Sequence, residues 1–500
     1  MDTIHTGTTG KAALMLIKRS LGARRLIFAI VSLIAAAAAG AQAPADQQPN
    51  AQVAPNTPLG ITPNNQASAP TPGTGTRVPF VYGIDAGIEE TDNVTLVQSN
   101  KVSQTIAVVD ADFDLKETTR LLDANAKGDF SYLDYLQNAY GSEFLGRFDG
   151  NLRAQIIPER LSWFVQDDFG QSSIDPFQET TPTNLENINY FATGPDLNLN
   201  LGPTAFFNAT ARYARVQYQT SPFDSNRLQE SLAFGLNLSS RSSVSLNGDN
   251  ERVMFSNTVL NEDYNRSNVF LRYALQGART EVTVDGGVTR TNTDGDSTTG
   301  GLARAVLTRK LSSAATLSLT AGHVVTDAGS NFSSLQSGAV GVIGAAPAPQ
   351  TGGTYTDNYG SAEWRYIRGR TTLAVSGRYE KDSYSDDAPL DNKRYGGEFK
   401  VTRQLSRDLE ADLIGRFYKT DFPQQTIETV VVGSPNYDDE LIAASLAWHF
   451  GRGLEIRLRA EHDARVTTGN DAGYKDNRGL LTIGYRPRPT DITMGGPAGI

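Results

Sequence analysis

Residues 454–463 read Leu-Glu-Ile-Arg-Leu-Arg-Ala-Glu-His-Asp, and apolar and polar side chains alternate one by one along most of this stretch. In an extended chain, the apolar residues from Leu454 to Ala460 share one face and the charged residues between them share the other. A helix would scatter both sets around its circumference, so the period of two indicates a β-strand. A heavily charged face opposite an apolar face is typical of a barrel in lipid, with apolar residues outside and a wet lumen inside.

The same alternation recurs through residues 79–485, for example in residues 80–89, 109–116 and 144–153. Strands of about 11 residues, tilted by about 45°, cross a hydrocarbon layer of roughly 25 Å, and these segments have suitable lengths. The sequence therefore predicts an all-β fold, a transmembrane antiparallel up-and-down β-barrel of about 20 strands. About 18 strands is the alternative, because residues 161–201 are ambiguous around their loop.

Tight turns are expected where glycine, proline and charged residues interrupt the alternation. The clearest of them lie at residues 158–160, 202–204, 277–278, 368–370 and 451–453. Longer polar loops separate each of these turns from the next. In outer-membrane barrels the short turns face the periplasm and the long loops face outward, so both ends of the barrel are expected on the periplasmic side.

The segments that flank the barrel are interpreted from composition. Residues 1–41 have a basic region, a short apolar stretch and small residues before a cleavage site, as in a cleaved signal peptide. Residues 42–78 contain many prolines and no aromatic residue, which predicts a disordered Pro/Ala/Gln-rich periplasmic tether. Residues 486–500 are expected to form a short periplasmic tail. The predicted location is the outer membrane of a Gram-negative cell.

Composition also narrows the chemistry. Removal of residues 1–41 takes away five basic residues and one acidic residue, so the net charge changes from −10 to −14, which argues against nucleic acid as a partner. The absence of cysteine excludes disulfides and thiolate metal sites. His323, His449 and His462 lie in separate strands, and no hydrolase or phosphate-loop motif is found. The sequence predicts no enzyme, no cofactor and no metal site.

The charged faces of the strands are assigned to the lumen. The candidate lumen-lining residues are Asp110, Asp112, Asp114, Arg147, Asp149, Arg153, Glu455, Arg457 and Arg459. Acids at positions i and i+2 of a strand are about 6.6 Å apart, a spacing that overlaps the carboxylate pair of an inverting glycosidase. Such acids recur in many strands beside arginines, which favours a polar lumen over a catalytic site.

Aromatic residues mark the membrane boundary. Trp163, Trp364 and Trp448 each lie close to a predicted periplasmic turn, as in an aromatic girdle. The last strand, residues 479–485, ends in Tyr485 and resembles the C-terminal signal read by the outer-membrane assembly machinery. Residues 486–500 follow that signal, which is a departure from the usual pattern.

One connection differs from the others in composition. Residues 338–349 read Gly-Ala-Val-Gly-Val-Ile-Gly-Ala-Ala-Pro-Ala-Pro within an otherwise polar link from Asp327 to Asp357. Apolar loops rarely extend into water. Three placements are open: this segment folds into the lumen as a constriction, packs on a neighbouring loop, or contacts a partner.

Residues 87–96 carry a family resemblance. Here the first strand runs into its loop with Thr91-Asp92-Asn93-Val94, and this stretch and the strand rhythm resemble the beta-barrel porin 2 family of outer-membrane proteins. The resemblance implies the barrel fold and an association with exopolysaccharide biosynthesis and export.

The predicted function is passage, or assisted export, of a polar polymer, with exopolysaccharide as the polymer that the resemblance implies. Two alternatives remain open: a general diffusion porin, and a structural or surface-interaction barrel closed by its own ion pairs and loops. Expected partners are outer-membrane lipid, lipopolysaccharide and the assembly machinery, and the resemblance adds a periplasmic polysaccharide export protein.

Overall fold

The computed structural model describes residues 80–175, 177–336, 352–385, 388–423, 425–427, 430–432, 436–451, 453–467 and 473–487. The predicted signal peptide, the tether, residues 488–500 of the tail and the apolar segment 338–349 lie outside the described residues. The predictions for these segments therefore stay predictions.

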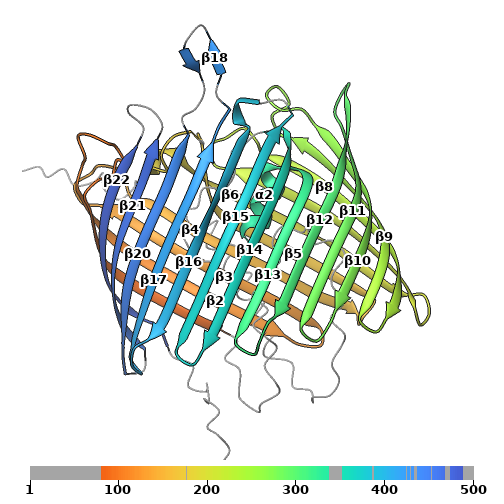
Figure 1. Ribbon diagram of the computed structural model, residues 1–500, viewed down its shortest axis with the longest axis horizontal. Coiled ribbons are helices and arrows are strands. Elements are labelled where there is room, and N and C mark those ends of the chain that lie inside the picture. Colours follow the sequence, from red (N-terminus) through yellow and green to blue (C-terminus); the bar gives the residue numbers. More distant parts are fainter. Residues whose placement is uncertain are drawn as a thin grey trace, which may run out of the picture. The chain divides into compact units, whose positions relative to one another are not determined.

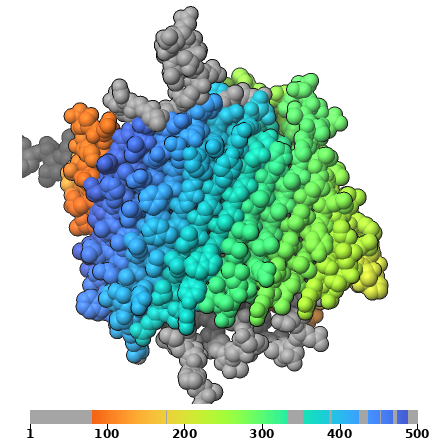
Figure 2. All heavy atoms as spheres, viewed as in Figure 1, coloured from red at the N-terminus to blue at the C-terminus, as the bar shows by residue number. Residues whose placement is uncertain are grey.

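Twenty antiparallel strands form one closed sheet (Figure 1). Each strand pairs with its neighbours in chain order, β17 pairs with β20, and β22 pairs with β1 to close the ring. The prediction of an all-β antiparallel up-and-down barrel of 20 strands is confirmed, and the 18-strand alternative is wrong. Figure 2 shows neighbouring strands in close contact over the visible face.

The strands of the first half of the barrel are β1 (Phe80–Thr91), β2 (Gln104–Thr118), β3 (Leu122–Tyr135), β4 (Glu143–Ile157), β5 (Leu161–Ser173), β6 (Leu185–Asn200), β7 (Ala205–Tyr218), β8 (Ser225–Ser239), β9 (Ser242–Phe255) and β10 (Tyr264–Gln276). The second half consists of β11 (Thr280–Asn292), β12 (Ser297–Lys310), β13 (Ala315–Asp327), β14 (Thr354–Arg368), β15 (Thr371–Tyr384), β16 (Asn392–Gln404), β17 (Leu409–Asp421), β20 (Tyr437–Phe450), β21 (Leu454–Thr467) and β22 (Tyr474–Tyr485).

The connections divide the barrel into a turn end and a loop end. The five predicted tight turns all join consecutive strands, and Gly369 (φ 58°) and Gly451 (φ 55°) supply the left-handed backbone that two of them need. At the loop end lie two 3₁₀ turns, η1 (Pro182–Asn184) and η2 (Ala388–Leu390), and a small hairpin of β18 (Gln425–Ile427) and β19 (Val430–Val432). The helix α2 (Ala328–Gln336) follows β13.

Side-chain exposure alternates along the strands. In β21, Leu454 and Leu458 are 47% and 55% exposed, whereas Glu455 between them is 1% exposed. The apolar residues therefore face outward and the charged residues face the interior, the reverse of a soluble sandwich, which hides its apolar face. Within the described residues, no helix is both long enough and apolar enough to cross a membrane.

Candidate functional site

The inward faces of the strands carry ion pairs between residues two positions apart. Arg457 Nη2 lies 2.7 Å from Glu455 Oε1, and Arg478 Nε lies 2.5 Å from Asp476 Oδ2. Because side chains i and i+2 point to the same face of a strand, each acid of this kind has a basic partner on its own strand. His449 Nδ1, on the neighbouring strand, lies 3.1 Å from Glu455 Oε2.

Each candidate lumen-lining residue has a definite neighbour. Their neighbours are Ser131 for Asp110, Arg486 for Asp112, Lys127 for Asp114, Asp129 for Arg147, Asp168 for Asp149, Asp196 for Arg153, Arg457 for Glu455 and Glu461 for Arg459. Most of these contacts join opposite charges, but Asp149 and Asp168 are carboxylates that face each other across β4 and β5. The structure brings these residues together in pairs rather than in one cluster.

Arg486 is a residue that sequence reasoning placed in the tail. Its guanidinium bonds to Asp112 and lies 3.4 Å from Asp85 Oδ2 and 3.9 Å from Glu455 Oε2. The chain after β22 thus turns its first side chain onto acids of β1, β2 and β21. An arginine directly after the last strand and inward-facing acids within the first two strands are the sequence signals for this contact.

The helix α2 lies inside the barrel. It contacts β4, β5 and β6 as well as β13, from which it starts, so it reaches across from one wall to another (Figure 1). Phe332 is 1% exposed and packs with Ile188 and Tyr190 of β6 and Val216 of β7. These residues face away from the exposed side of their strands, where Tyr213 of β7 is 43% exposed. An apolar patch on the inner wall therefore binds the helix.

A buried ionic network holds the start of α2. Asp327, the last residue of β13, accepts hydrogen bonds from Arg227 Nη2 at 2.6 Å and Nη1 at 3.0 Å in the two-point geometry that suits arginine and carboxylate. The same carboxylate accepts bonds from the backbone of Gly329 and Ser330 and thus caps the helix.

Two further side chains complete the network. Arg266 bonds to Glu251 and donates to the Val325 carbonyl at 2.8 Å, and Glu251 lies 3.3 Å from Arg227. The network runs from β13 to β8, β9 and β10, and so fixes the connection at the point where it enters the lumen. Sequence reasoning missed this network because its central pair, Arg227 and Asp327, joins positions 100 residues apart.

A second connection crosses at the loop end. Glu179, between β5 and β6, lies 3.3 Å from Arg465 of β21, and Phe177 packs edge-on against Phe422 after β17, with ring centroids 5.2 Å apart. Burial raises the pKa of Glu179, and the Arg465 guanidinium offsets part of that rise. Two elements, α2 and this loop, therefore join parts of the wall that are not neighbours in the ring.

The Thr91-Asp92-Asn93-Val94 stretch joins the first strand to the last. Thr91 donates to Asp476, Asp92 accepts from the backbone and side chain of Asn477, and Asn93 donates to the carbonyls of Lys475 and Val97. Val94 packs in an apolar cluster with Ile106, Val108 and Tyr135. The motif that carries the family resemblance thus occupies the loop end of the seam where the barrel closes.

The three tryptophans all lie near the turn end. Trp163 and Trp448 are 43% and 54% exposed, and Trp364 stacks on Tyr366 with ring centroids 5.8 Å apart. The Trp163 indole donates to the Thr193 hydroxyl at 2.8 Å, so its polar edge is satisfied while its ring stays exposed.

Comparison with known proteins gives fold-level likeness only. No family model and no curated protein sequence matches the chain. The FrpB iron transporter from Neisseria meningitidis is 9% identical, with 82% of each chain covered and a TM-score of 0.39. The siderophore receptor PirA from Pseudomonas aeruginosa is 9% identical, with 83% of this chain and 81% of that chain covered and a TM-score of 0.38.

OccK2 (OpdF) from Pseudomonas aeruginosa is 11% identical, with 82% of this chain and 99% of that chain covered and a TM-score of 0.33. At these scores the likeness carries no argument about substrate or mechanism. The beta-barrel porin 2 resemblance likewise stays a prediction.

Proposed function

We propose that the protein spans the outer membrane and gives small polar solutes a charge-lined path across it. The observation that carries this proposal is the placement of α2, which crosses the interior of the barrel and is fixed there by Arg227 and Asp327. A barrel of 20 strands without such an element leaves a wide lumen. An element held across that lumen restricts passage by size.

The exposure pattern supports the membrane part of the proposal. Outward residues such as Leu458 and Ile483 are each 55% exposed, and a continuous exposed apolar face suits a hydrocarbon layer but not water. The paired charges of the candidate lumen-lining residues support a polar path for solutes. Opposite charges that lie side by side bind a passing solute weakly and so let it leave again. The expected partners outside the barrel, lipopolysaccharide and the assembly machinery, belong to this same proposal.

Uptake into liposomes tests this function. Vesicles containing the purified protein should admit mono- and disaccharides quickly and admit larger oligosaccharides progressively more slowly, with osmotic swelling as the measurement. Heat-denatured protein is the control. Equal swelling rates for small and large sugars, or no swelling above the control, would refute a size-limited channel.

Export of a polar polymer is the second candidate function, and we propose an exopolysaccharide as that polymer. Its support is the mixture of charge signs along β4 and β21, since many weak contacts let a chain slide where one tight site would trap it. In this case α2 must move aside during passage.

A gene deletion separates the two candidates. Loss of surface polysaccharide with normal uptake of small sugars supports the polymer, and normal polysaccharide with slow sugar uptake supports the solute channel. Polysaccharide loss would also place a periplasmic polysaccharide export protein among the partners to be tested.

A further inference from the structure

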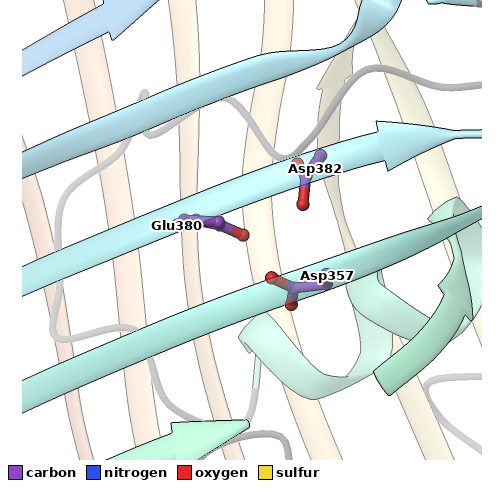
Figure 3. A group of neighbouring side chains, drawn as sticks. All are labelled: Asp357, Glu380 and Asp382. Atoms are coloured by element: carbon purple, nitrogen blue, oxygen red, sulfur yellow. The ribbon is translucent and has the colours of Figure 1, made fainter. Parts of the chain in front are cut away.

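Three buried acidic side chains converge on the inner wall of the barrel, on two neighbouring strands. Asp357 lies on β14, and Glu380 and Asp382 lie on β15. Asp357 and Asp382 are directly opposite each other in the strand register. One carboxylate oxygen from each of the three lies within 4.8 Å of the others, and Figure 3 shows the side chains pointing toward a common space.

The charges around this cluster do not balance. Glu380 has a partner, because Arg378 Nε lies 2.9 Å from its Oε2. Arg394 is opposite Glu380 in the register, but its guanidinium lies over the ring of Tyr418, 4.7 Å from the centroid. Among the described residues, neither Asp357 nor Asp382 forms an ion pair. Two like charges therefore face each other with no ion-pair partner of their own, an arrangement that destabilises a pair of strands.

Unpartnered polar atoms point to a ligand at the same place. Asp357 and Asp382 are 5% and 2% exposed, and one oxygen of each is buried without a hydrogen-bond partner among the described residues. The other Asp382 oxygen accepts a bond of 3.3 Å from Asn392.

The next register pair continues the pattern. Tyr355 and Tyr384 stack with ring centroids 4.8 Å apart, and their buried hydroxyls also lack described partners. Because nearly all buried polar atoms in folded proteins are bonded, unbonded oxygens gathered in this way call for a bound ion or water.

We propose that Asp357, Glu380 and Asp382 bind a divalent cation, with Ca²⁺ as the ion that fits. Hard divalent cations take oxygen ligands, and Ca²⁺ binds them at about 2.3 to 2.6 Å, so two ligands on opposite sides of the ion are roughly 5 Å apart. Mg²⁺ demands near-ideal octahedral geometry and usually keeps several water ligands, so three protein carboxylates suit the more adaptable Ca²⁺ better. Two positive charges neutralise the unpaired aspartates and join β14 to β15.

The position of the site is informative. Asp357 is three residues beyond Thr354, where β14 begins after the connection that contains α2. The ion therefore anchors the far end of that connection, as Arg227 and Asp327 anchor the near end. The histidine and cysteine spacing gave no sign of this site, because its ligands are carboxylates brought together by strand register.

Terbium luminescence tests the proposal directly. Tb³⁺ replaces Ca²⁺ at oxygen sites, and Tyr355 and Tyr384 lie close enough to sensitise its emission. The full-length protein, purified in detergent and stripped with EDTA, should show tyrosine-excited Tb³⁺ emission that Ca²⁺ displaces. Asp382→Asn should weaken Ca²⁺ displacement by about tenfold or more. Asp168→Asn is the matched control, because Asp168 is a 1% exposed inward carboxylate opposite Asp149 and outside the cluster.

A second measurement distinguishes a cluster that binds a cation from a cluster that is protonated. Ca²⁺ should raise the unfolding temperature of the wild-type protein and of Asp168→Asn, and leave that of Asp382→Asn unchanged. In EDTA, Asp382→Asn should be at least as stable as the wild-type protein, because it removes a like-charge repulsion. If Ca²⁺ raises all three unfolding temperatures equally, or none of them, the cluster holds a proton instead and the proposal is overturned.

Discussion

Thr91 donates a hydrogen bond of 2.5 Å to Asp476, and this contact joins the first strand of the barrel to the last across 385 positions of sequence. Asp92 bonds to Asn477 at the same sequence distance, and Asn93 bonds to the Lys475 carbonyl. The closing pair β1 and β22 thus has side-chain bonds at its loop end in addition to its backbone ladder. This seam holds the ring closed.

Asn93→Ala should weaken the seam. The side chain is fully buried and bonds to Val97 and Lys475, so its loss leaves partly buried backbone groups of these two residues unpaired at a cost of about 1 kcal/mol. The temperature at which the barrel loses its compact migration on unboiled SDS gels should fall. Gln98→Ala, at an exposed position of the same loop, is the control, and an equal fall in both variants would count against the seam.

The seam should also lose stability in acid. Burial raises the pKa of Asp92, but the hydrogen bonds from Asn477 outweigh it and hold that pKa below its usual value. A lowered carboxyl pKa stabilises the fold above the unfolded value of about 3.9, and this contribution is lost as the pH falls through the folded pKa. The difference in unfolding midpoint between the wild-type protein and Asp92→Asn should be constant near neutral pH, begin to shrink near about pH 4 and vanish below the folded pKa of Asp92. If the difference in unfolding midpoint persists in strong acid, the ionised Asp92 carboxylate is not its cause.

Leu458→Arg should place a charge in the hydrocarbon layer. Leu458 faces outward, 55% exposed, and lies in the turn-end half of β21, so the expected cost in unfolding free energy is about 2 kcal/mol. Urea titration in lipid vesicles measures it. Glu455 is a poor inward control, because an arginine there would join Arg457 and Arg486. Asn151→Arg, on the inward face of β4, is better matched and should be mild; equal costs would mean that the faces are reversed.

Arg227→Ala should release α2. Breaking this buried ion pair should cost about 3 to 5 kcal/mol, because Asp327 keeps only the more distant Arg266 at 3.9 Å. A freed helix should also make the single-channel current noisier. Arg272→Ala removes another buried pair, with Asp285, far along the chain from α2. We expect it to lower stability and leave the current trace steady. If the two variants give identical current traces, the network around Arg227 and Asp327 does not control the current through the barrel.

The positions and faces of the strands could be predicted from the sequence because they depend on alternation between adjacent residues. Alternation of Leu454 and Leu458 with charged neighbours fixes which side each residue faces, and the glycine turns fix where strands reverse. Partner choice is not local: nothing near Arg227 in the sequence identifies Asp327. The sequence therefore predicts the two faces but not the network.

The helix α2 could not be predicted from the sequence for a related reason. Its sequence, residues 328–336, contains Gly, Ser and Asn, which are weak helix formers, so its stability comes from packing. One sequence signal was present: Ile188 and Val216 place apolar side chains on faces that other strands fill with charge. An apolar patch on the predicted inner wall indicates an element that folds inward and covers it.

Single-channel conductance after removal of α2 tests the central claim most directly. Asp327 and Thr354 are paired in the register of β13 and β14, so a short glycine-containing turn can replace residues 328–353 without disturbing either strand. If α2 narrows the path, the shortened protein should still migrate as a compact barrel before boiling and should conduct several times more current than the wild-type protein in a planar bilayer. Unchanged conductance from a correctly folded barrel would contradict the account.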